Sequence, residues 1–490
     1  MEKYDFDELS SKLTKELSKK TKKESGIFFT PPITVSSTLE KLKEYFNKKN
    51  KIKTILEPSC GSCEFIKAIN EKYTSVNITG IEFNKTIYEA IKDKYDKENI
   101  SLLNENFLTY STQTLFDLII GNPPYFIIKK MKEEKKEEDK QLEANKYDIK
   151  YNEWFDGRPN IFIIFILKSM DLLKDNGILC FVLPKSFINC LYYNKTRQRI
   201  YDNYKIIDIT ECYDTYLETQ QPTIVLTIKK KTNNTIKKKN DKYTLKKSNN
   251  LIFGTPNNIT ELKKLYEESK TLHDLNFKVS VGTVVWNQCK DILVGKVDKT
   301  RPKKFKKKES TTTTTTNTEE TTSTTEETTS TTEETTSTTE ETTSTTEETT
   351  STTEESIAVK YNTRLIYSSD IKNNKLLEPK TYKARGKKSF IDKKGIKTTT
   401  LLVNRGYGVG SYNFQYCLLK DETYLVENHL ICINYKDNTK KIEETELIAK
   451  YNKIIKSLEH DKTKKFIKLY FGNNAINTTE LNHILPIYEM

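Results

Sequence analysis

The residues Asn122, Pro123, Pro124 and Tyr125 form the motif with the clearest chemical meaning in this chain. They follow the apolar run LIIG at 118–121, which predicts a strand that ends where the motif begins. An amine attached to an aromatic base is a poor nucleophile, because its lone pair is delocalised into the ring. If the Asn122 side-chain oxygen and the Pro123 carbonyl each accept one of its N–H groups, the nitrogen can direct its lone pair at an electrophilic methyl group. Tyr125 offers a flat face for an extruded base, so the motif predicts catalysis by positioning, with no covalent nucleophile.

Two further motifs carry acidic groups at predicted strand ends. The segment TILEPSCGSCEF (54–65) is typical of a strand, a turn containing Gly61 and a helix, a geometry that brings backbone close to a nucleotide-like ligand. An ordinary tight turn would give the same pattern. The segment GIEFN (80–84) places Glu82 about 25 residues after Glu57, where a carboxylate can accept hydrogen bonds from two ribose hydroxyls. A solvated acid at a helix start is the alternative reading.

These motifs need elements to position them, and the first 228 residues alternate short apolar strands with amphipathic helices. This alternation predicts an α/β fold with a parallel, doubly wound, Rossmann-like sheet. The expected strands are Thr54–Leu56, Asn77–Ile81, Leu118–Ile120, Gly177–Leu183, Ile206–Ile209 and Thr223–Ile228. The expected helices are 34–47, 64–72, 85–95 and 160–174.

The remainder of the chain differs in composition. A basic stretch leads us to expect a linker at 229–255, and a C-terminal mixed α+β domain is expected over 256–490, with a strand-rich centre at 401–435 and helices near 441–456 and 460–470. Five copies of TTSTTEE fill 321–355; they have no apolar position, so 303–356 is expected to be a disordered insertion in that domain. Residues 319–355 hold twelve Glu and no Lys or Arg, so the net charge of +13 for the chain becomes +25 for the rest. Such a surplus favours a polyanionic partner.

Other classes of protein are disfavoured. The chain begins without an apolar signal region, and no stretch of 18 apolar residues occurs, so neither secretion nor membrane insertion is expected. The eight Cys are scattered, with one CxxC at Cys60 and Cys63 and an HxxC at His429 and Cys432 in an apolar run. Neither a disulfide scaffold nor a metal site is expected.

Several motifs, taken in order, resemble a known family. GIFFTPP (26–32), LEPSCGSCEF (56–65), GIEFN (80–84), ENFL (105–108) and GNPPYF (121–126) are similar to the motifs of gamma-class, TaqI-like adenine-N6 DNA methyltransferases. The resemblance continues through 157–187, and VGTVVWNQCKD (281–291) and GNNAINTTELNHILPI (472–487) look like the start and end of a target-recognition domain. It covers most of the chain apart from the inserts.

The resemblance implies S-adenosylmethionine as cofactor and a role for each matching residue. Asn122, Pro123, Pro124 and Tyr125 would form the catalytic motif, and Tyr125 would stack on the target base. The cofactor would be bound by residues from four motifs: Phe28, Thr30 and Pro31 at its methionine end, Glu57, Ser59 and Gly61 in the loop, Glu82 at the ribose and Phe83 at the adenine, and Asn106 with its neighbour Phe107.

Two residues depart from the family's pattern, and one assignment is less direct. Asn106 stands where an Asp usually accepts from the cofactor's adenine amine, so weaker binding is expected. Cys63 stands in place of a glycine, although Cys tolerates positive φ poorly. A second aromatic that closes the other face of the flipped base is expected in 211–225, where Tyr216 is the candidate, with Tyr213 close behind.

The expected activity is site-specific methylation of adenine N6 in duplex DNA, as in restriction-modification, by an intracellular enzyme that acts on DNA as a monomer. RNA adenine methylation is the first alternative, because a flipped adenine looks alike in either polymer. Protein N5-glutamine methylation is the second, because the same motif can hold a carboxamide nitrogen. A compact glutamine methyltransferase would not need a basic, strand-rich half downstream.

Overall fold

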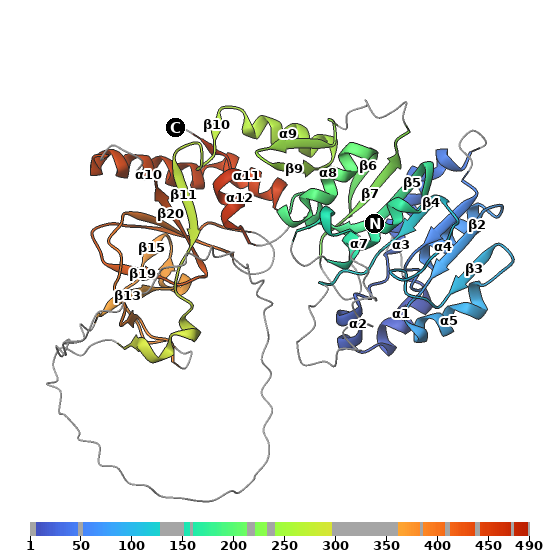
Figure 1. Cartoon of the computed structure of the whole chain (residues 1–490), viewed down its shortest axis with the longest axis horizontal. Helices are drawn as coiled ribbons and strands as arrows, with labels where there is room; N and C mark the ends of the chain where they lie inside the picture. The colour runs from blue at the N-terminus through green and yellow to red at the C-terminus, as the bar shows by residue number, and fades with distance from the viewer. Residues whose placement is uncertain are drawn as a thin grey trace, which may run out of the picture.

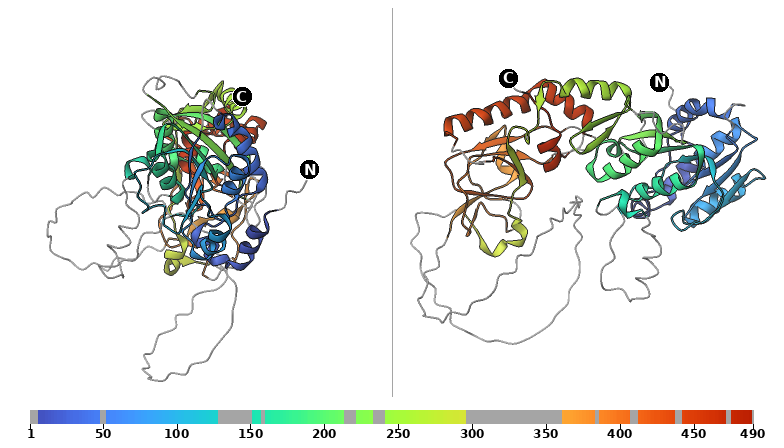
Figure 2. Two further views of the ribbon diagram at one scale, coloured as in Figure 1. Left: turned by 90° about the vertical axis from the view of Figure 1, so that its right-hand side faces the viewer. Right: turned by 45° about the horizontal axis from the view of Figure 1, so that its top comes forward.

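The computed structural model describes most of the chain in two lobes, which Figures 1 and 2 show from three directions. The described residues are 6–47, 52–127, 151–156, 160–212, 221–232, 241–295, 361–382, 386–406, 412–436, 442–471 and 475–488. The predicted insertion at 303–356 lies outside them. The first lobe contains the motifs of the N-terminal half, and the second contains the C-terminal sheets and helices.

A seven-stranded sheet forms the centre of the first lobe, in the strand order β3-β2-β1-β4-β5-β7-β6. Its strands are β1 (Thr54–Glu57), β2 (Asn77–Ile81), β3 (Ile100–Leu103), β4 (Phe116–Gly121), β5 (Leu173–Pro184), β6 (Tyr204–Cys212) and β7 (Thr223–Lys230). The first five strands are parallel, as the alternation of strands and helices predicts. Strand β7 is instead antiparallel to both β5 and β6, because the connection from Cys212 to Thr223 is too short for a helical crossover.

Helices cover both faces of this sheet, because successive strand residues point to opposite sides. In β4, Leu118 and Ile120 pack on one core with Ile55, whereas Ile119 packs on the other core with Leu56. The first of these cores is covered by α1 (Glu8–Glu16), α3 (Pro32–Leu42), α4 (Glu64–Lys72) and α5 (Lys85–Tyr95). The second is covered by α7 (Ile161–Asp171) and α8 (Asn194–Asn203). The sheet is therefore doubly wound, and its short buried strands are nearly continuous apolar runs, as expected when both faces are covered.

The strand registers explain why the motifs meet. Glu57 ends β1 opposite Gly80 of β2, Glu82 follows the end of β2, and Asn122 follows the end of β4. Since β1, β2 and β4 are parallel neighbours, all three side chains start from the same carboxyl edge of the sheet, where α/β folds bind their ligands.

The second lobe is a mixed α+β structure with two four-stranded sheets, in the orders β11-β20-β17-β18 and β12-β16-β13-β19. The strands of the first are β11 (Phe277–Val281), β17 (Thr400–Asn404), β18 (Tyr416–Leu419) and β20 (Leu430–Tyr435). Those of the second are β12 (Leu293–Val294), β13 (Thr363–Ile366), β16 (Phe390–Ile391) and β19 (Tyr424–Val426). Smaller pairings join β14 (Ile371–Lys372) to β15 (Lys375–Leu376) and β10 (Ser269–Lys270) to β21 (Ile487–Tyr488). The helices are α9 (Pro256–Tyr266), α10 (Glu444–Glu459), α11 (Asp461–Tyr470) and α12 (Thr478–His483).

The lobes are joined within the predicted basic linker, where β8 (Thr244–Lys247) and β9 (Asn250–Phe253) form a hairpin. Arg197 of α8 is fully buried and donates to the backbone oxygen of Leu251 and to Oδ1 of Asn250. The Asn250 amide in turn donates to the Tyr470 hydroxyl at 3.1 Å. This chain of hydrogen bonds connects α8, which packs on the seven-stranded sheet, to α11 of the second lobe.

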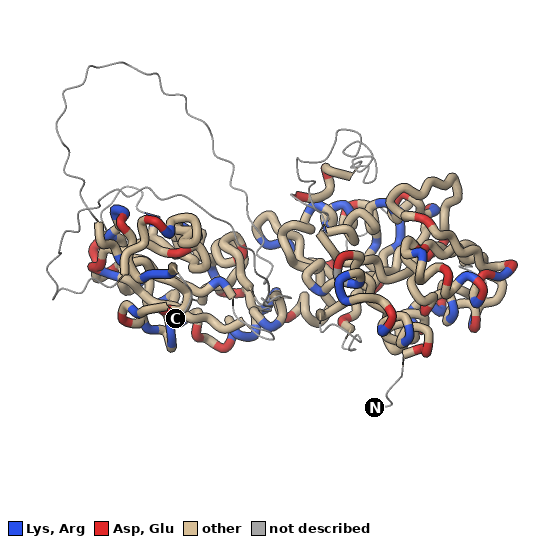
Figure 3. The backbone as a smooth tube through the Cα atoms, turned by 90° about the horizontal axis from the view of Figure 1, so that it is seen from below, with Lys and Arg blue, Asp and Glu red and all other residues tan. Residues whose placement is uncertain are grey.

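Basic and acidic residues are interleaved along both lobes in the view of Figure 3. The positive surplus of the chain therefore does not gather on one uniform face in that view.

Candidate active site

The Asn122–Tyr125 motif is held by hydrogen bonds from three directions. The Asn122 amide Nδ2 donates to the Phe28 carbonyl at 3.2 Å, and its Oδ1 accepts from the Tyr125 hydroxyl at 2.6 Å. The Tyr125 hydroxyl also lies 2.8 Å from the carbonyl oxygen of Val182 on β5. Ser59 Oγ donates to the Asn122 carbonyl at 3.1 Å. The side-chain oxygen that the sequence assigns to substrate is thus oriented by its own neighbours.

The ring of Tyr125 is half-buried and packs edge-on against Phe162 of α7, with ring centroids 5.9 Å apart. Phe162 is fully buried and contacts Phe187 and Tyr193 in the same way. The aromatic ring expected to stack on a base is therefore supported by a cluster of rings behind it.

The N-terminal segment that precedes α3 lies directly against this motif. Phe28 is half-buried, Thr30 and Pro31 are buried, and Pro32 begins α3 with its fixed φ. Gly26 has a φ of +63°, and a Cβ there would lie 2.7 Å from the Tyr125 backbone nitrogen. Only glycine allows both this conformation and this close approach, so Gly26 sets the contact between the two segments.

The loop after β1 is closed by backbone hydrogen bonds. Cys60 N–H donates to the Ile81 carbonyl at 2.9 Å, and Cys63 N–H donates to the Cys60 carbonyl at 2.7 Å. Gly61 and Cys63 both have left-handed backbones, with φ of +51° and +66°. Cys63 stands where the family has a glycine, and it adopts the left-handed conformation that favours glycine, at the position that precedes α4.

Glu82 and Glu57 are the buried carboxylates at this edge. The Glu82 carboxylate accepts from Gly61 N–H at 3.0 Å and from Asn84 N–H at 2.7 Å, and burial raises its pKa to about 7. Burial also raises the pKa of Glu57 well above its ordinary value. Within the described part of the chain, Oε2 of Glu57 is buried without a hydrogen-bond partner. An acceptor of this kind is costly unless a donor reaches it.

Phe83, Asn106 and Phe107 complete the predicted cofactor residues. The Phe83 side chain is 64% exposed, which is unusual for a phenyl ring in a well-packed lobe. Asn106 Oδ1 accepts from Leu108 N–H at 3.0 Å, which uses one of its two acceptor positions. Phe107 is 2% exposed and packs on Phe165 of α7. Phe107 therefore anchors the Asn106 turn in the core, and its assignment as a cofactor contact remains a prediction.

These residues fit S-adenosylmethionine. The cofactor offers ammonium and hydroxyl donors, and the edge provides two buried carboxylates, one of them with an acceptor oxygen that has no partner. The cofactor also has a flat adenine, for which the exposed ring of Phe83 is suited.

Three further expectations from the sequence concern the second stacking aromatic, metal binding and membrane insertion. Tyr216 and Tyr213 lie outside the described residues, so the second stacking aromatic remains a prediction. His429 and Cys432 form no metal-binding group, and no cluster of three potential ligands occurs among the residues that the structure describes. In those residues, no helix is both long enough and apolar enough to cross a membrane.

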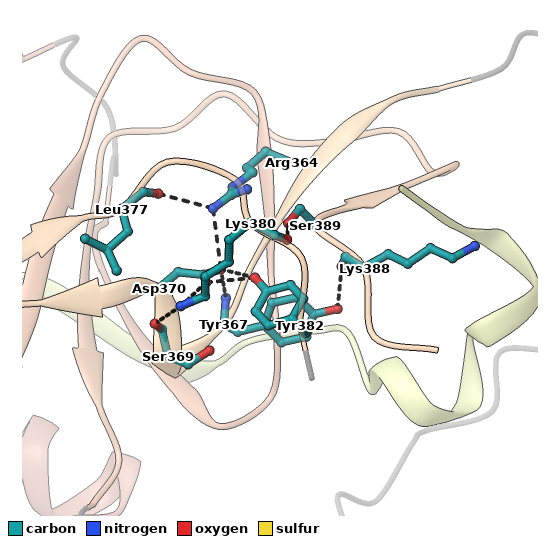
Figure 4. Close-up of polar contacts among 9 residues, drawn as sticks. All are labelled: Arg364, Tyr367, Ser369, Asp370, Leu377, Lys380, Tyr382, Lys388 and Ser389. Carbon is teal, nitrogen blue, oxygen red and sulfur yellow. Dashed lines mark hydrogen bonds and ion pairs between the residues drawn. The ribbon is translucent and has the colours of Figure 1, made fainter. Parts of the chain in front are cut away.

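The second lobe contains a buried charged cluster around Asp370, drawn in Figure 4. The fully buried Asp370 carboxylate accepts from the Tyr382 hydroxyl at 2.7 Å and lies 3.5 Å from Arg364 and from Lys380. The Lys387 ammonium lies 4.0 Å from the centroid of the Tyr367 ring, and burial lowers its pKa. This cluster ties together loops that have little regular structure of their own.

Sequence reasoning missed two contributions to the site. Gly26 of GIFFTPP has no role assigned from the sequence, although a glycine directly before a segment that must approach another backbone is a usable signal. The first helix, α1, was not predicted, and its Ser10 lies beside the loop after β1. The polar face of α1 resembles any solvated helix, so only the tertiary structure could reveal this contact.

Comparison with known proteins finds similarity to methyltransferases. Residues 36–217 match the family described as Eco57I restriction-modification methylase. The Type II methyltransferase M.CvrRI of Paramecium bursaria Chlorella virus XZ-6E is 25% identical over 485 residues, or 99% of each chain. The modification methylase CviBIII of Paramecium bursaria Chlorella virus NC1A is 31% identical over 215 residues, covering 43% of this chain and 52% of that protein. The Type II methyltransferase M.AccI of Acinetobacter calcoaceticus is 32% identical over 181 residues, 36% of this chain and 31% of that protein.

The chain thus aligns with 99% of the first relative, 52% of the second and 31% of the third. The family match at 36–217 includes the carboxyl ends of β1, β2 and β4. The order of its motifs, its strand topology and these matches make the chain similar to restriction-modification methylases, with S-adenosylmethionine as the cofactor.

Proposed function

We propose that this enzyme methylates the N6 amine of an adenine that is flipped out of duplex DNA at a specific site. The observation that carries the proposal is the Asn122 amide, fixed between the Phe28 carbonyl and the Tyr125 hydroxyl at the carboxyl edge of β4. An amide held in this way presents an oxygen of fixed direction to an incoming N–H group.

We assign each of these residues a separate role in binding or in methyl transfer. Asn122 Oδ1 and the Pro123 carbonyl accept the two N–H groups of the adenine amine, so that its lone pair is directed away from the ring plane. Bound S-adenosylmethionine supplies an electrophilic methyl group on a sulfonium. Glu82 holds ribose hydroxyls, Phe83 packs on the cofactor's adenine, and the loop at Ser59 and Gly61 brings the two ligands together. Catalysis then depends on positioning two reactants and needs no nucleophile from the protein.

The Tyr125 hydroxyl has two acceptors within reach, Asn122 Oδ1 at 2.6 Å and the Val182 carbonyl at 2.8 Å. Donation of the single hydroxyl proton to Asn122 Oδ1 occupies one of the two acceptor positions of that oxygen and leaves the other for the substrate amine. We infer that Tyr125 both supports the target base with its ring and orients the Asn122 amide with its hydroxyl.

We assign DNA binding to residues 256–490 and methyl transfer to residues 1–228, joined by the linker at 229–255. The support is the charge of the chain, which is +13 overall and more positive without the Glu-rich tract, together with the separate cores of the two lobes. Phosphate contacts by Lys and Arg supply much of the affinity of proteins for DNA.

The test uses the full chain, labelled S-adenosylmethionine, and unmethylated DNA, RNA and a glutamine-bearing protein extract in parallel. Products are hydrolysed and identified by mass. N6-methyladenine from DNA alone is expected. Label only in RNA or only in protein would refute the assignment of DNA as substrate while retaining the catalytic site.

Three variants separate the catalytic roles. Asn122→Ala is expected to abolish turnover while cofactor binding, measured by calorimetry, stays largely intact. Tyr125→Phe keeps the ring and should lose less activity than Tyr125→Ala, which loses both ring and hydroxyl. Undiminished activity of Asn122→Ala would refute its role, and equal activity of the two Tyr125 variants would refute the role of the ring.

A further inference from the structure

Helix α1 hydrogen-bonds to the loop after β1, which we assign to the cofactor. Ser10 of α1 is fully buried, and its Oγ lies 2.9 Å from Ser62 Oγ and hydrogen-bonds to Oε1 of Glu64. Ser62 Oγ also donates to Glu64 Oε1, at 3.3 Å. We call these three residues the Ser10 bridge. Their contacts span 52 and 54 positions of sequence, so they depend on how α1 docks rather than on local folding.

The docking of α1 is itself well supported. Leu13 is 1% exposed and packs in the same core as Cys63 and Phe65. At the start of the helix, the Asp7 carboxylate accepts from Leu9 N–H and lies 2.6 Å from the ammonium of Lys67 on α4. The apolar contact holds the helix on the lobe, and the polar contacts set its register along α4.

The bridge reaches the part of the loop that most needs support. Ser62 lies between Gly61 and Cys63, both of which have left-handed backbones, and a non-glycine residue in that conformation is strained. On the other side of the loop, Ser59 is held by the Asn122 carbonyl. Gly61 N–H, in turn, donates to the Glu82 carboxylate assigned to the ribose. The loop is therefore fixed at Ser59 by the catalytic motif and at Ser62 by α1.

We propose that Ser10 is a positioning residue for cofactor binding, which holds the strained loop in its binding conformation before S-adenosylmethionine arrives. A protein that populates its binding conformation only in part binds its ligand more weakly by that fraction. Ser10 touches neither substrate nor reacting atoms, so its loss affects cofactor affinity and leaves the chemical step unchanged. This inference rests on the proposed roles of the loop and of Glu82.

The experiment compares Ser10→Ala with two controls. Ser11→Ala makes the same change one residue along the helix, and Ile91→Val lowers stability within the same core without touching the bridge. Calorimetry measures S-adenosylmethionine binding to each full-length variant, and a DNA-binding assay without cofactor serves as a second readout. Hydrogen exchange over 58–66 in the cofactor-free protein reports loop opening directly.

Ser10→Ala is expected to weaken S-adenosylmethionine binding about tenfold, with faster exchange over 58–66, and to leave DNA affinity and kcat at saturating cofactor within about twofold. Ser62→Ala should produce the same loss, and the double variant should be no worse than either single one, because both remove one bridge. Unchanged cofactor affinity in Ser10→Ala, or an equal loss in Ile91→Val, would overturn the inference alone. Failure of the wild-type protein to bind S-adenosylmethionine would overturn the proposed function as well.

Discussion

Replacing Gly26 by alanine tests whether the N-terminal segment positions the catalytic motif. Gly26 ends α2 (Lys19–Ser25) in a left-handed conformation with φ of +63°. A side chain there costs about 1–2 kcal/mol from the backbone alone. The added Cβ would lie 2.7 Å from the Tyr125 nitrogen, whereas ordinary contact begins at 3.4 Å, so the two segments must separate by about 0.7 Å.

That displacement acts on catalysis through the Phe28 carbonyl, two residues along, which holds the Asn122 amide at 3.2 Å. A misplacement of about 1 Å can cost on the order of 100-fold in rate. We therefore expect Gly26→Ala to lower kcat by roughly 10- to 100-fold. Cofactor affinity should fall by less than kcat does, because Gly61 N–H keeps its bond to Glu82 even when the Phe28 segment is displaced.

The assay is single-turnover methyl transfer with saturating DNA and S-adenosylmethionine, alongside thermal unfolding. Gly295→Ala is the matched control, since a Cβ at Gly295 meets nothing within 4 Å. A Gly26→Ala rate within twofold of wild type would refute the reasoning, and so would an equal loss in Gly295→Ala.

Three further predictions concern pH, stability and salt. Because burial raises the pKa of Glu82 from 4.5 to about 7, its contribution to apo stability is fully present below pH 4.5 and is lost as pH rises through 7. The proposed contact of Glu82 with the ribose needs the ionised carboxylate, so calorimetry should show S-adenosylmethionine affinity falling up to about tenfold per unit below pH 7. A Glu82→Gln variant with the same pH dependence would contradict this. Asp370→Ala leaves the buried Arg364 without its partner and should destabilise the second lobe by about 3–5 kcal/mol in denaturant unfolding. Cofactor binding should persist, and the exposed Asp291→Ala should have little effect. DNA affinity should fall linearly in log–log plots against salt, with a slope of about −0.9 per phosphate neutralised; a salt-independent affinity would exclude phosphate contacts as its source.

Individual helices and strands were predicted correctly where apolar residues repeat with a clear local period. The helices expected at 64–72 and 85–95 are α4 and α5 with the same bounds, and Asn77–Ile81 is β2. Each has a clear period of apolar residues and an evident boundary, such as the Asn84 side chain that caps α5 at its first turn. Strand β3 and helix α8 were not predicted; α8 is largely polar, so its sequence carries little apolar periodicity. The antiparallel direction of β7 was also not predicted. The expectation of a parallel sheet did not take into account that the connection between β6 and β7 is too short for a helical crossover.

The sequence by itself determined the chemistry: the order of motifs, the family they resemble, and the residue types that can hold an amine and a nucleotide. Tertiary structure decided how those residues are oriented and supported. The Phe28 carbonyl orients the Asn122 amide from 94 positions away, and Ser10 reaches Ser62 across 52. Such contacts carry no local signal, because a backbone carbonyl or a serine hydroxyl is chemically the same wherever it lies. Their meaning comes from the parallel register that brings β1, β2 and β4 to one edge, and from the helix that packs beside it.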